Sequence, residues 1–235
     1  MILSGIQKFT LLDFPGKIAC IFFIGGCNYR CGFCHNPEFV LPEELRKLSD
    51  SFIPEQAALN FLKQRIGLLQ GVVITGGEPT IMPDLENFIR KIRDLGFAVK
   101  LDTNGNKPEV IVSLIKKGLI DYVAMDFKTS LPNYEMLVGR GADKMKLQKS
   151  IDFLKKGKID YEFRTTLIRE VHTPEILKAM QKTLAGAKRL YLQTFRNGIT
   201  LHPSFKNCHP FSLEEMQEIA KQFSASVGEV FVREE

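Results

Sequence analysis

The sequence has no apolar run long enough to cross a membrane. Its 235 residues are 44% hydrophobic and 25% charged, and no stretch approaches the ~18 consecutive apolar residues that a spanning helix needs. The first residues also lack the pattern of a signal peptide, because Lys8 and Asp13 interrupt the apolar stretch and no small-residue cleavage site follows. We therefore expect a cytoplasmic protein with no membrane partner.

The chain also lacks blocks of like charge and a disulfide framework. Its net charge of +5 is spread along the sequence, which argues against a nucleic-acid partner and would suit an acidic electron carrier. The five cysteines are odd in number, and three of them fall within eight residues. In a chain without a secretory signal, this clustering favours metal binding over disulfides.

Apolar β-rich segments alternate with segments of helical periodicity. The expected strands are residues 17–25, 71–75, 97–103, 122–127, 160–168 and 189–195. The expected helices are residues 54–66, 82–96, 107–118, 144–157 and 173–186. Prolines near several of the helix starts and glycines just past the ends support these boundaries. A last helix and a short edge strand are expected at about 211–234.

The alternation predicts a parallel sheet covered by helices. Near-continuous apolar strands are typical of sheets that are buried on both faces, and right-handed crossovers wind such units into a barrel or part of one. Six units are too few for a closed eight-stranded barrel. The predicted fold class is therefore α/β, an open partial (β/α)6 TIM-like barrel in a single domain of residues 1–235, with its core at about 16–200.

The chemically unusual residues follow the strands at one end. They are Cys27, Thr75 to Pro79, Asp102 to Gly105, Asp126 to Lys128, Thr166, and Gln193 to Phe195. In barrel-like α/β folds the carboxyl ends of the strands carry the active site. We therefore expect these residues to meet at one rim.

Three cysteines form the most specific pattern, Cys27-x3-Cys31-x2-Cys34. Three thiolates on one loop can hold three irons of a 4Fe-4S cluster and leave the fourth iron open. A zinc site that adds His35 remains an alternative. The CGFCH pattern of c-type haem attachment is another, but it requires export and leaves Cys27 without a role.

The remaining two cysteines are expected to lie outside this site. Cys20 alternates with apolar residues inside the first expected strand, which predicts a buried free thiol. Cys208 lies in the segment FKNCHPF and is interpreted as a loop cysteine without a ligand role.

The segment CNYRCGFC, with aromatic Phe33 before the last cysteine, resembles the signature of the radical S-adenosylmethionine (SAM) superfamily. TGGEP resembles the glycine-rich motif of that family, which implies that Gly76, Gly77 and Glu78 hold the amino group of the methionine moiety. The resemblance implies an oxidoreductase of the radical SAM fold that cleaves SAM reductively. The 5'-deoxyadenosyl radical so formed abstracts a hydrogen atom from a substrate.

Further motifs resemble the glycyl-radical-enzyme activases over essentially the whole chain. They are LDFPGK before the cysteines, CHNPE after them, LDTNG and DFK. The resemblance implies that Asp102, Thr103 and Asn104 lie beside the bound cofactor and that Lys128 lies near its carboxylate. A helix-leading turn at DTNG and a plain surface lysine at position 128 remain alternatives.

Arg164 and Gln193 are weaker candidates for cofactor binding. Arg164 could bind a carboxylate with two hydrogen bonds, or it could pair with Asp160 or Glu162. Some activases have a histidine where this chain has Gln193, which leaves that role open. The aromatic residues Phe195 and Phe205 are interpreted as packing residues.

The compact form, with five cysteines and no inserted eight-cysteine ferredoxin domain, looks most like the activating protein of anaerobic ribonucleoside-triphosphate reductase. The activating enzyme of pyruvate formate-lyase shares the same motifs and remains open. The implied cofactors are one 4Fe-4S cluster and SAM, and the implied partners are a glycyl radical enzyme and flavodoxin or ferredoxin as electron donor. A radical SAM enzyme acting on a small molecule and a non-enzymatic zinc-binding module are the alternatives of other classes.

Overall fold

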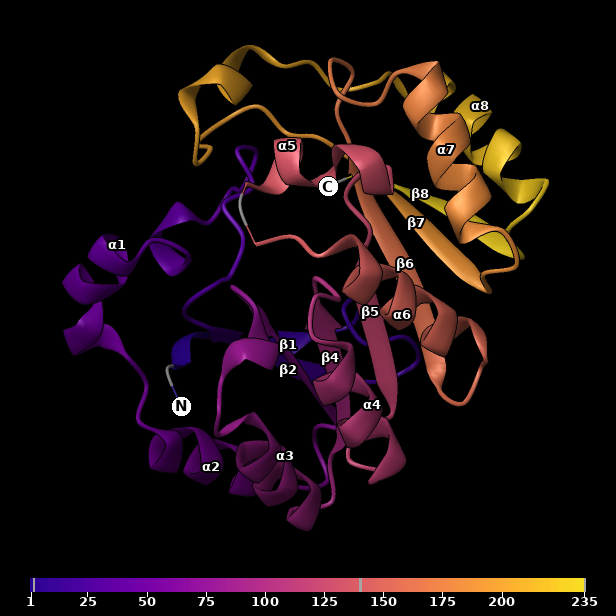
Figure 1. Ribbon diagram of the computed structural model, residues 1–235. Helices are drawn as coiled ribbons and strands as arrows, with labels where there is room; N and C mark the ends of the chain where they lie inside the picture. The colour runs from indigo at the N-terminus through magenta and orange to yellow at the C-terminus, as the bar shows by residue number, and fades with distance from the viewer. Residues whose placement is uncertain (2, 140, 235) are drawn as a thin grey trace.

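The computed structural model describes residues 1, 3–139 and 141–234, which form one curved sheet with helices on its outer side (Figure 1). The sheet has eight strands in the order of the sequence. They are β1 (Leu3–Thr10), β2 (Ala19–Ile24), β3 (Gly71–Gly76), β4 (Ala98–Thr103), β5 (Tyr122–Asp126), β6 (Asp160–Leu167), β7 (Arg189–Thr194) and β8 (Glu229–Arg233). The strands from β2 to β8 are parallel, and β1 is antiparallel to β2.

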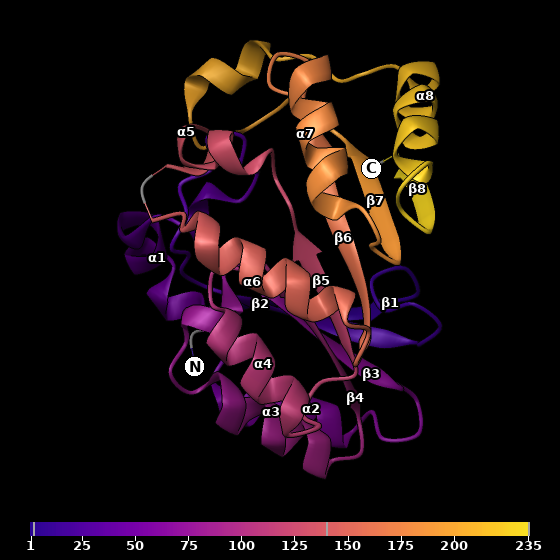
Figure 2. The same cartoon turned by 45° about the vertical axis from the view of Figure 1, so that its right-hand side comes forward.

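The eight α-helices are α1 (Pro42–Lys47), α2 (Glu55–Lys63), α3 (Leu85–Asp94), α4 (Pro108–Lys116), α5 (Tyr134–Val138), α6 (Lys144–Lys155), α7 (Pro174–Leu184) and α8 (Leu213–Ser224), all within the described ranges. The longer ones lie along the outer face of the sheet, as the turned view shows (Figure 2). Pro108 and Pro174 occupy the first helical positions of α4 and α7, where the missing N–H costs no hydrogen bond. None of the described helices is long and apolar enough to cross a bilayer.

The six predicted strands and the predicted edge strand are confirmed as β2 to β8. The prediction missed β1, because most of its side chains are exposed or only partly buried and its sequence therefore has no clear alternation. Its first residue pairs with β2 through Leu3 and Ile24, which anchors the N-terminal segment on the sheet. The short helices α1 and α5 were not predicted either.

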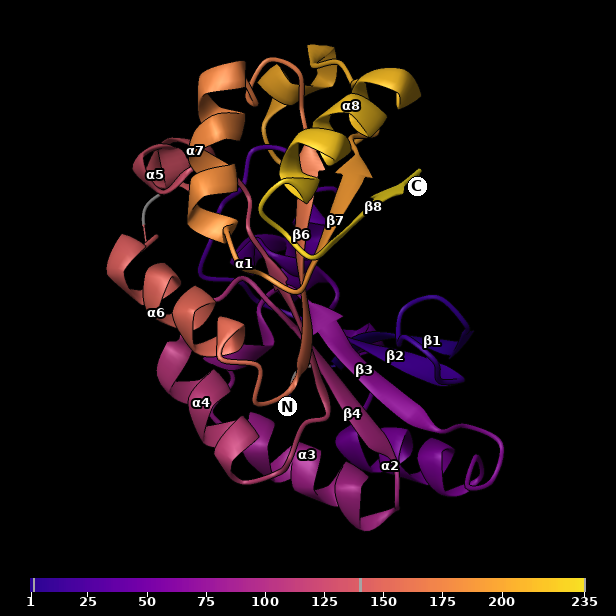
Figure 3. The ribbon, with the colours of Figure 1, turned by 90° about the vertical axis from the view of Figure 1, so that its right-hand side faces the viewer.

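The sheet does not close into a barrel. Among the described strands, β1 pairs only with β2 and β8 only with β7, so both are edges. Figure 3 shows these two edge strands on the same side of the molecule, at the two ends of the curved sheet. The open (β/α) barrel is therefore confirmed, with one antiparallel strand added at its start.

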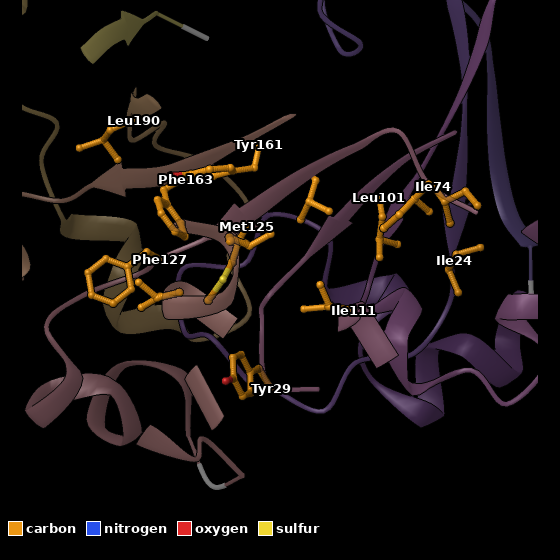
Figure 4. Packing of buried hydrophobic residues seen from close by; sticks show 14 of the residues in the cluster. Ile24, Tyr29, Ile74, Leu101, Ile111, Met125, Phe127, Tyr161, Phe163 and Leu190 are labelled. Atoms are coloured by element: carbon orange, nitrogen blue, oxygen red, sulfur yellow. The ribbon is translucent and has the colours of Figure 1, made fainter. Parts of the chain in front are cut away.

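The main core lies between the sheet and the outer helices. Side chains of neighbouring strands, such as Ile74, Leu101 and Met125, pack in one layer with Ile111 of α4 (Figure 4). Burying each such side chain contributes about 1.5–3 kcal/mol. This rigid layer fixes the strand ends from which the rim loops start.

A smaller apolar cluster fills the barrel interior at the amino ends of the strands. Phe14, from the segment between β1 and β2, packs against Ala19, Ile21, Val73 and Tyr122, with 6.2 Å between the ring centres of Phe14 and Tyr122. The interior is therefore blocked at the amino ends of the strands. The carboxyl ends remain for a site.

Candidate cofactor site

A cavity of about 190 Å³ opens at the carboxyl ends of the parallel strands. Its lining includes every candidate residue of the sequence analysis except Gln193: Cys27, Cys31, Phe33, Cys34, Gly76, Gly77, Glu78, Asp102, Thr103, Asn104, Lys128 and Arg164. Gln193 borders a smaller adjoining hollow together with Thr166 and Arg164. The prediction that residues following the strands meet at one rim thus grouped residues that lie more than a hundred positions apart in sequence.

The three cysteines lie on the loop that follows β2. All three thiols line the cavity, and burial raises the pKa of Cys27 to about 12 and of Cys31 to about 11, and also raises that of Cys34. The thiols are therefore protonated near neutral pH, and binding a metal would release their protons. Three convergent soft donors beside a cavity fit three irons of a 4Fe-4S cluster.

The two alternative sites, for zinc and for c-type haem, both use His35. Its Nε2 donates a hydrogen bond to the carbonyl oxygen of Arg196 at 2.8 Å. In the part of the chain that the structure describes, no three His, Cys, Asp or Glu side chains are placed to hold a single metal ion. Cys20 is fully buried in β2, as the sequence predicted, and Cys208 lies outside the cavity lining.

A strap, defined here as residues 196–211 between β7 and α8, holds the cysteine loop from outside. Its amide groups at Leu201 and His202 donate hydrogen bonds to the carbonyl oxygens of Cys34 (3.0 Å) and Gly32 (2.9 Å). The Phe205 ring covers Gly32 and packs against Phe33 with 6.1 Å between ring centres. Figure 1 shows the strap reaching over the rim toward the cysteine loop.

Gly32 has no room for a side chain beneath Phe205. A Cβ at this position would lie 2.3 Å from the Phe205 ring. Gly32→Ala is expected to lower the free energy of unfolding by about 1–3 kcal/mol, because the strap must move away. Urea denaturation of the metal-free protein measures the change.

The double variant Gly32→Ala/Phe205→Leu tests the cause of this loss. Leu lacks the ring atoms that meet the new methyl group, so the cost of Gly32→Ala should shrink markedly in the Phe205→Leu background. An equal cost in both backgrounds would show that the methyl group disturbs something other than the strap.

Gly76 and Gly77 are required by the packing of two chain segments. Gly76 has φ +114°, and a Cβ on Gly77 would lie 2.0 Å from the carbonyl oxygen of Gly26, at the base of the cysteine loop. The amides of Gly77 and Glu78 donate to the carbonyl oxygens of Ile24 (2.7 Å) and Gly26 (2.8 Å). The glycine-rich turn therefore fixes the base of the cysteine loop.

Glu78 connects the turn after β3 with the loop after β4. Its buried carboxylate accepts hydrogen bonds from the Thr103 hydroxyl (2.7 Å), the Asn104 amide (2.6 Å) and the amide and hydroxyl groups of Thr80. The Asn104 side chain in turn donates to Asn28 in the cysteine loop (2.8 Å). Three rim loops are thus held in one arrangement, and Glu78 has several partners before any ligand binds.

Five charged side chains run across β4, β5 and β6 on the inner face of the sheet, and we call them the charge chain. It consists of four ion pairs: Lys100–Asp102 (2.5 Å), Arg164–Asp102 (2.8 Å), Arg164–Asp126 (2.9 Å) and Lys128–Asp126 (3.2 Å). Burial alone would raise the pKa of both carboxyl groups, but the cations outweigh it. The pKa of Asp126 falls to about 2, and that of Asp102 is also lowered.

The alternative in which Arg164 pairs with Asp160 or Glu162 is wrong. The strand register places Asp126 directly opposite Arg164, whereas Asp160 pairs with Lys188, and Glu162 accepts a hydrogen bond from Tyr122. Lys128 is not a surface lysine, because its side chain is only 17% exposed, with its Nζ 5.6 Å from the centre of the Phe33 ring. Lys128 and Arg164 both line the cavity, so the charge chain presents two cationic groups there beside the carboxylates of Asp102 and Asp126.

A buried histidine fixes the backbone of Lys128. His172 accepts a hydrogen bond from the Ile168 amide at Nδ1 (2.9 Å) and donates from Nε2 to the Lys128 carbonyl oxygen (3.0 Å). Burial lowers the pKa of His172, which favours the neutral ring that this pattern requires. The sequence analysis missed His172, as it missed the lining residues Tyr29 and Asn36. The only sequence signal for His172 was its position on the loop after β6.

Comparison with known proteins gives three relevant similarities. The model of the Radical SAM superfamily matches residues 21–183. A candidate glycyl-radical enzyme activating enzyme from Methanocaldococcus jannaschii is 32% identical over 99% of this chain and 95% of its own length. The 7-carboxy-7-deazaguanine synthase of Methanopyrus kandleri is 26% identical over 91% of this chain and 83% of its own.

Among solved structures, a domain of a pyruvate-formate lyase-activating enzyme from Bacteroides vulgatus superposes with a TM-score of 0.55 at 16% identity. It covers 69% of this chain and 98% of that one. At this identity the likeness concerns the fold alone. It agrees with the open barrel described above.

Proposed function

The chain belongs to the radical SAM superfamily, and we propose that it is an activase that generates a glycyl radical on a partner enzyme. The observation that carries the proposal is the cavity that joins the cysteine loop to the glycine-rich turn, the loop after β4 and Lys128. Similarity to an activating enzyme over nearly the whole chain supports the choice among radical SAM enzymes.

The residues present fit both cofactors. Cys27, Cys31 and Cys34 would hold a 4Fe-4S cluster, and the ammonium group of Lys128 would attract the carboxylate of SAM. When bound, the cluster supplies the electron that cleaves SAM, and the 5'-deoxyadenosyl radical that results removes a hydrogen atom from the partner's glycine.

The contribution of the remaining residues is to bind and to orient. The strap and the glycine-rich turn fix the cysteine loop, and Glu78 fixes the loop of Thr103 and Asn104 against it. Arg164 holds both carboxylates of the charge chain, so that Lys128 remains oriented toward the cavity. Such preorganisation means that little of the cofactor's binding energy is spent on ordering the loops.

The open side of the sheet is suited to a macromolecular substrate. Apart from a single bridge between Leu3 and Ile53, no described segment pairs with the outer sides of the edges β1 and β8, so the glycine-bearing loop of a partner could enter between them. We propose anaerobic ribonucleoside-triphosphate reductase as the partner on the motif resemblance, with pyruvate formate-lyase as the alternative. Reduced flavodoxin or ferredoxin is the proposed electron donor.

A small-molecule substrate is the second candidate function. The similarity to a 7-carboxy-7-deazaguanine synthase covers 91% of this chain, and the site described above would serve such a reaction equally well. The two functions differ in whether the radical ends on a protein.

Two measurements test the proposal in sequence. The anaerobically reconstituted protein with a strong reductant should convert SAM to methionine and 5'-deoxyadenosine, which chromatography detects. Mixed with its glycyl radical enzyme, it should then produce a glycyl radical doublet in electron paramagnetic resonance. Iron-loaded protein that leaves SAM intact would refute the radical SAM assignment for this chain, and SAM cleavage without a radical on any glycyl radical enzyme of the host would favour the small-molecule function.

A further inference from the structure

The hydroxyl group of Tyr29 is buried without a hydrogen-bond partner. Tyr29 lies within the cysteine loop, lines the cavity and is only 1% exposed. Across residues 1, 3–139 and 141–234, four buried side-chain polar atoms have no partner, and two of them belong to Asn28 and Tyr29, between the first two cysteines. A buried donor that forms no hydrogen bond destabilises the fold.

The neighbouring residue Tyr134 shows that a tyrosine hydroxyl can be buried in this region and still form hydrogen bonds. The rings of Tyr29 and Tyr134 contact each other edge to face, with 6.3 Å between their centres, and both are almost fully buried. The Tyr134 hydroxyl accepts a hydrogen bond from the Lys128 amide (2.9 Å) and donates to the Asp126 carbonyl oxygen (3.3 Å). Of these two tyrosine hydroxyl groups, that of Tyr29 has no partner.

The groups around the Tyr29 hydroxyl indicate what its partner would be. Tyr29 lies between Cys27 and Cys31 in the chain and lines the same cavity as their thiols and the Glu78 carboxylate. The Tyr29 hydroxyl forms no hydrogen bond to that carboxylate, which accepts hydrogen bonds from Thr80, Thr103 and Asn104. The sulfur atoms remain, and the Tyr29 backbone amide already donates to Cys27 Sγ at 3.4 Å.

Binding of the cysteine sulfur atoms to iron would supply the missing hydrogen-bond acceptor. A neutral thiol accepts hydrogen bonds weakly, whereas a thiolate bound to iron carries negative charge and accepts them well. Hydrogen bonds to the sulfur atoms of an iron–sulfur cluster are one of the factors that set its reduction potential. They favour the reduced state, which carries one more negative charge.

We propose that Tyr29 is a hydrogen-bond donor to the cluster, and that its hydroxyl donates to the sulfur of Cys27 or Cys31 once these are bound to iron. The inference rests on the cluster of the proposed function and adds a residue that tunes it. Tyr29 thereby makes the cluster easier to reduce.

Tyr29→Phe removes the hydroxyl and leaves the ring. In the metal-free protein this variant should melt at or above the wild-type temperature, because an unpaired buried donor is removed. In the reconstituted protein without SAM, its cluster should have a more negative potential in an anaerobic redox titration followed by electron paramagnetic resonance. We expect a tenfold shift in the reduction equilibrium, which is about 59 mV for a one-electron couple.

Tyr134→Phe is the matched control, because it removes a hydroxyl with two partners from an equally buried ring. It should lower the melting temperature of the metal-free protein by about 2–4 °C, the opposite of the Tyr29 variant.

Three results would overturn the inference. A Tyr29→Phe variant with wild-type iron content and wild-type potential would show that the hydroxyl does not reach the cluster. A lower melting temperature of metal-free Tyr29→Phe would show that the hydroxyl already has a partner in the fold. Wild-type protein that takes up no iron and sulfide would refute the cluster itself, a failure of the proposed function that metal analysis distinguishes from the other two.

Discussion

Simultaneous replacement of Cys27, Cys31 and Cys34 by Ala should leave a folded protein that binds no cluster and cleaves no SAM. Anaerobic reconstitution of the wild type should give about four irons and four sulfides per chain, and the triple variant close to none. The reason is that the three thiols line one cavity, and thiolates are the ligands that hold such a cluster. Iron and acid-labile sulfide analysis, with the absorbance of the cluster, measures the result.

The two other cysteines provide the control. Cys20 is enclosed in β2, and Cys208 is on the strap outside the cavity lining, so the double variant Cys20→Ala/Cys208→Ala should retain the wild-type iron content. Some stability will be lost at position 20, because truncating a buried side chain leaves a small cavity. Iron retained by the triple variant, or lost from the double variant, would overturn the ligand assignment.

The sequence was sufficient for the parallel part of the fold because local signals and the tertiary structure agree there. Strands such as β3 and β5 are near-continuous apolar segments, and the main helices are periodic segments with proline or glycine near their ends. By contrast, β1 is held in the sheet by its pairing with β2 and has few buried side chains. Its place in the sheet depends on a partner that no local pattern reveals.

The composition of the site was predictable for a similar reason, but its internal connections were not. Parallel strands bring their carboxyl ends to one rim, so residues such as Cys27 and Asp102 could be grouped from their positions alone. The partners of Arg164 and Glu78 follow instead from the register between strands and from the shape of the loops. Gly32 similarly depends on Phe205, more than 170 residues away in the chain.

Arg164→Met is expected to destabilise the metal-free protein by about 3–5 kcal/mol at pH 7, because Asp102 and Asp126 each lose one of their two counter-ions. Arg164 is the only member of the charge chain that contacts both Asp102 and Asp126. Lys100 and Lys128 remain in the variant, each with one carboxylate. Urea denaturation at pH 7 measures the loss.

The surface pair of Arg169 and Glu215 provides a matched control. Both side chains are more than 40% exposed, so Arg169→Met should leave the free energy of unfolding nearly unchanged. Equal losses in the two arginine variants would show that the charge chain behaves as a surface network.

The effect of Arg164→Met should also depend on pH, and the sign follows from the shifts of the two carboxyl groups. In the wild type the pKa of Asp126 is lowered to about 2 and that of Asp102 is lowered as well, so their stabilising contribution is present above pH 4 and is lost as the pH falls toward 2. Without Arg164, burial raises both pKa values relative to the wild type, and the carboxyl groups take up protons at higher pH. The difference in unfolding free energy between wild type and variant should therefore shrink from pH 7 to about pH 4. A difference that stays constant over this range would mean that the loss comes from packing of the arginine side chain and not from its charge.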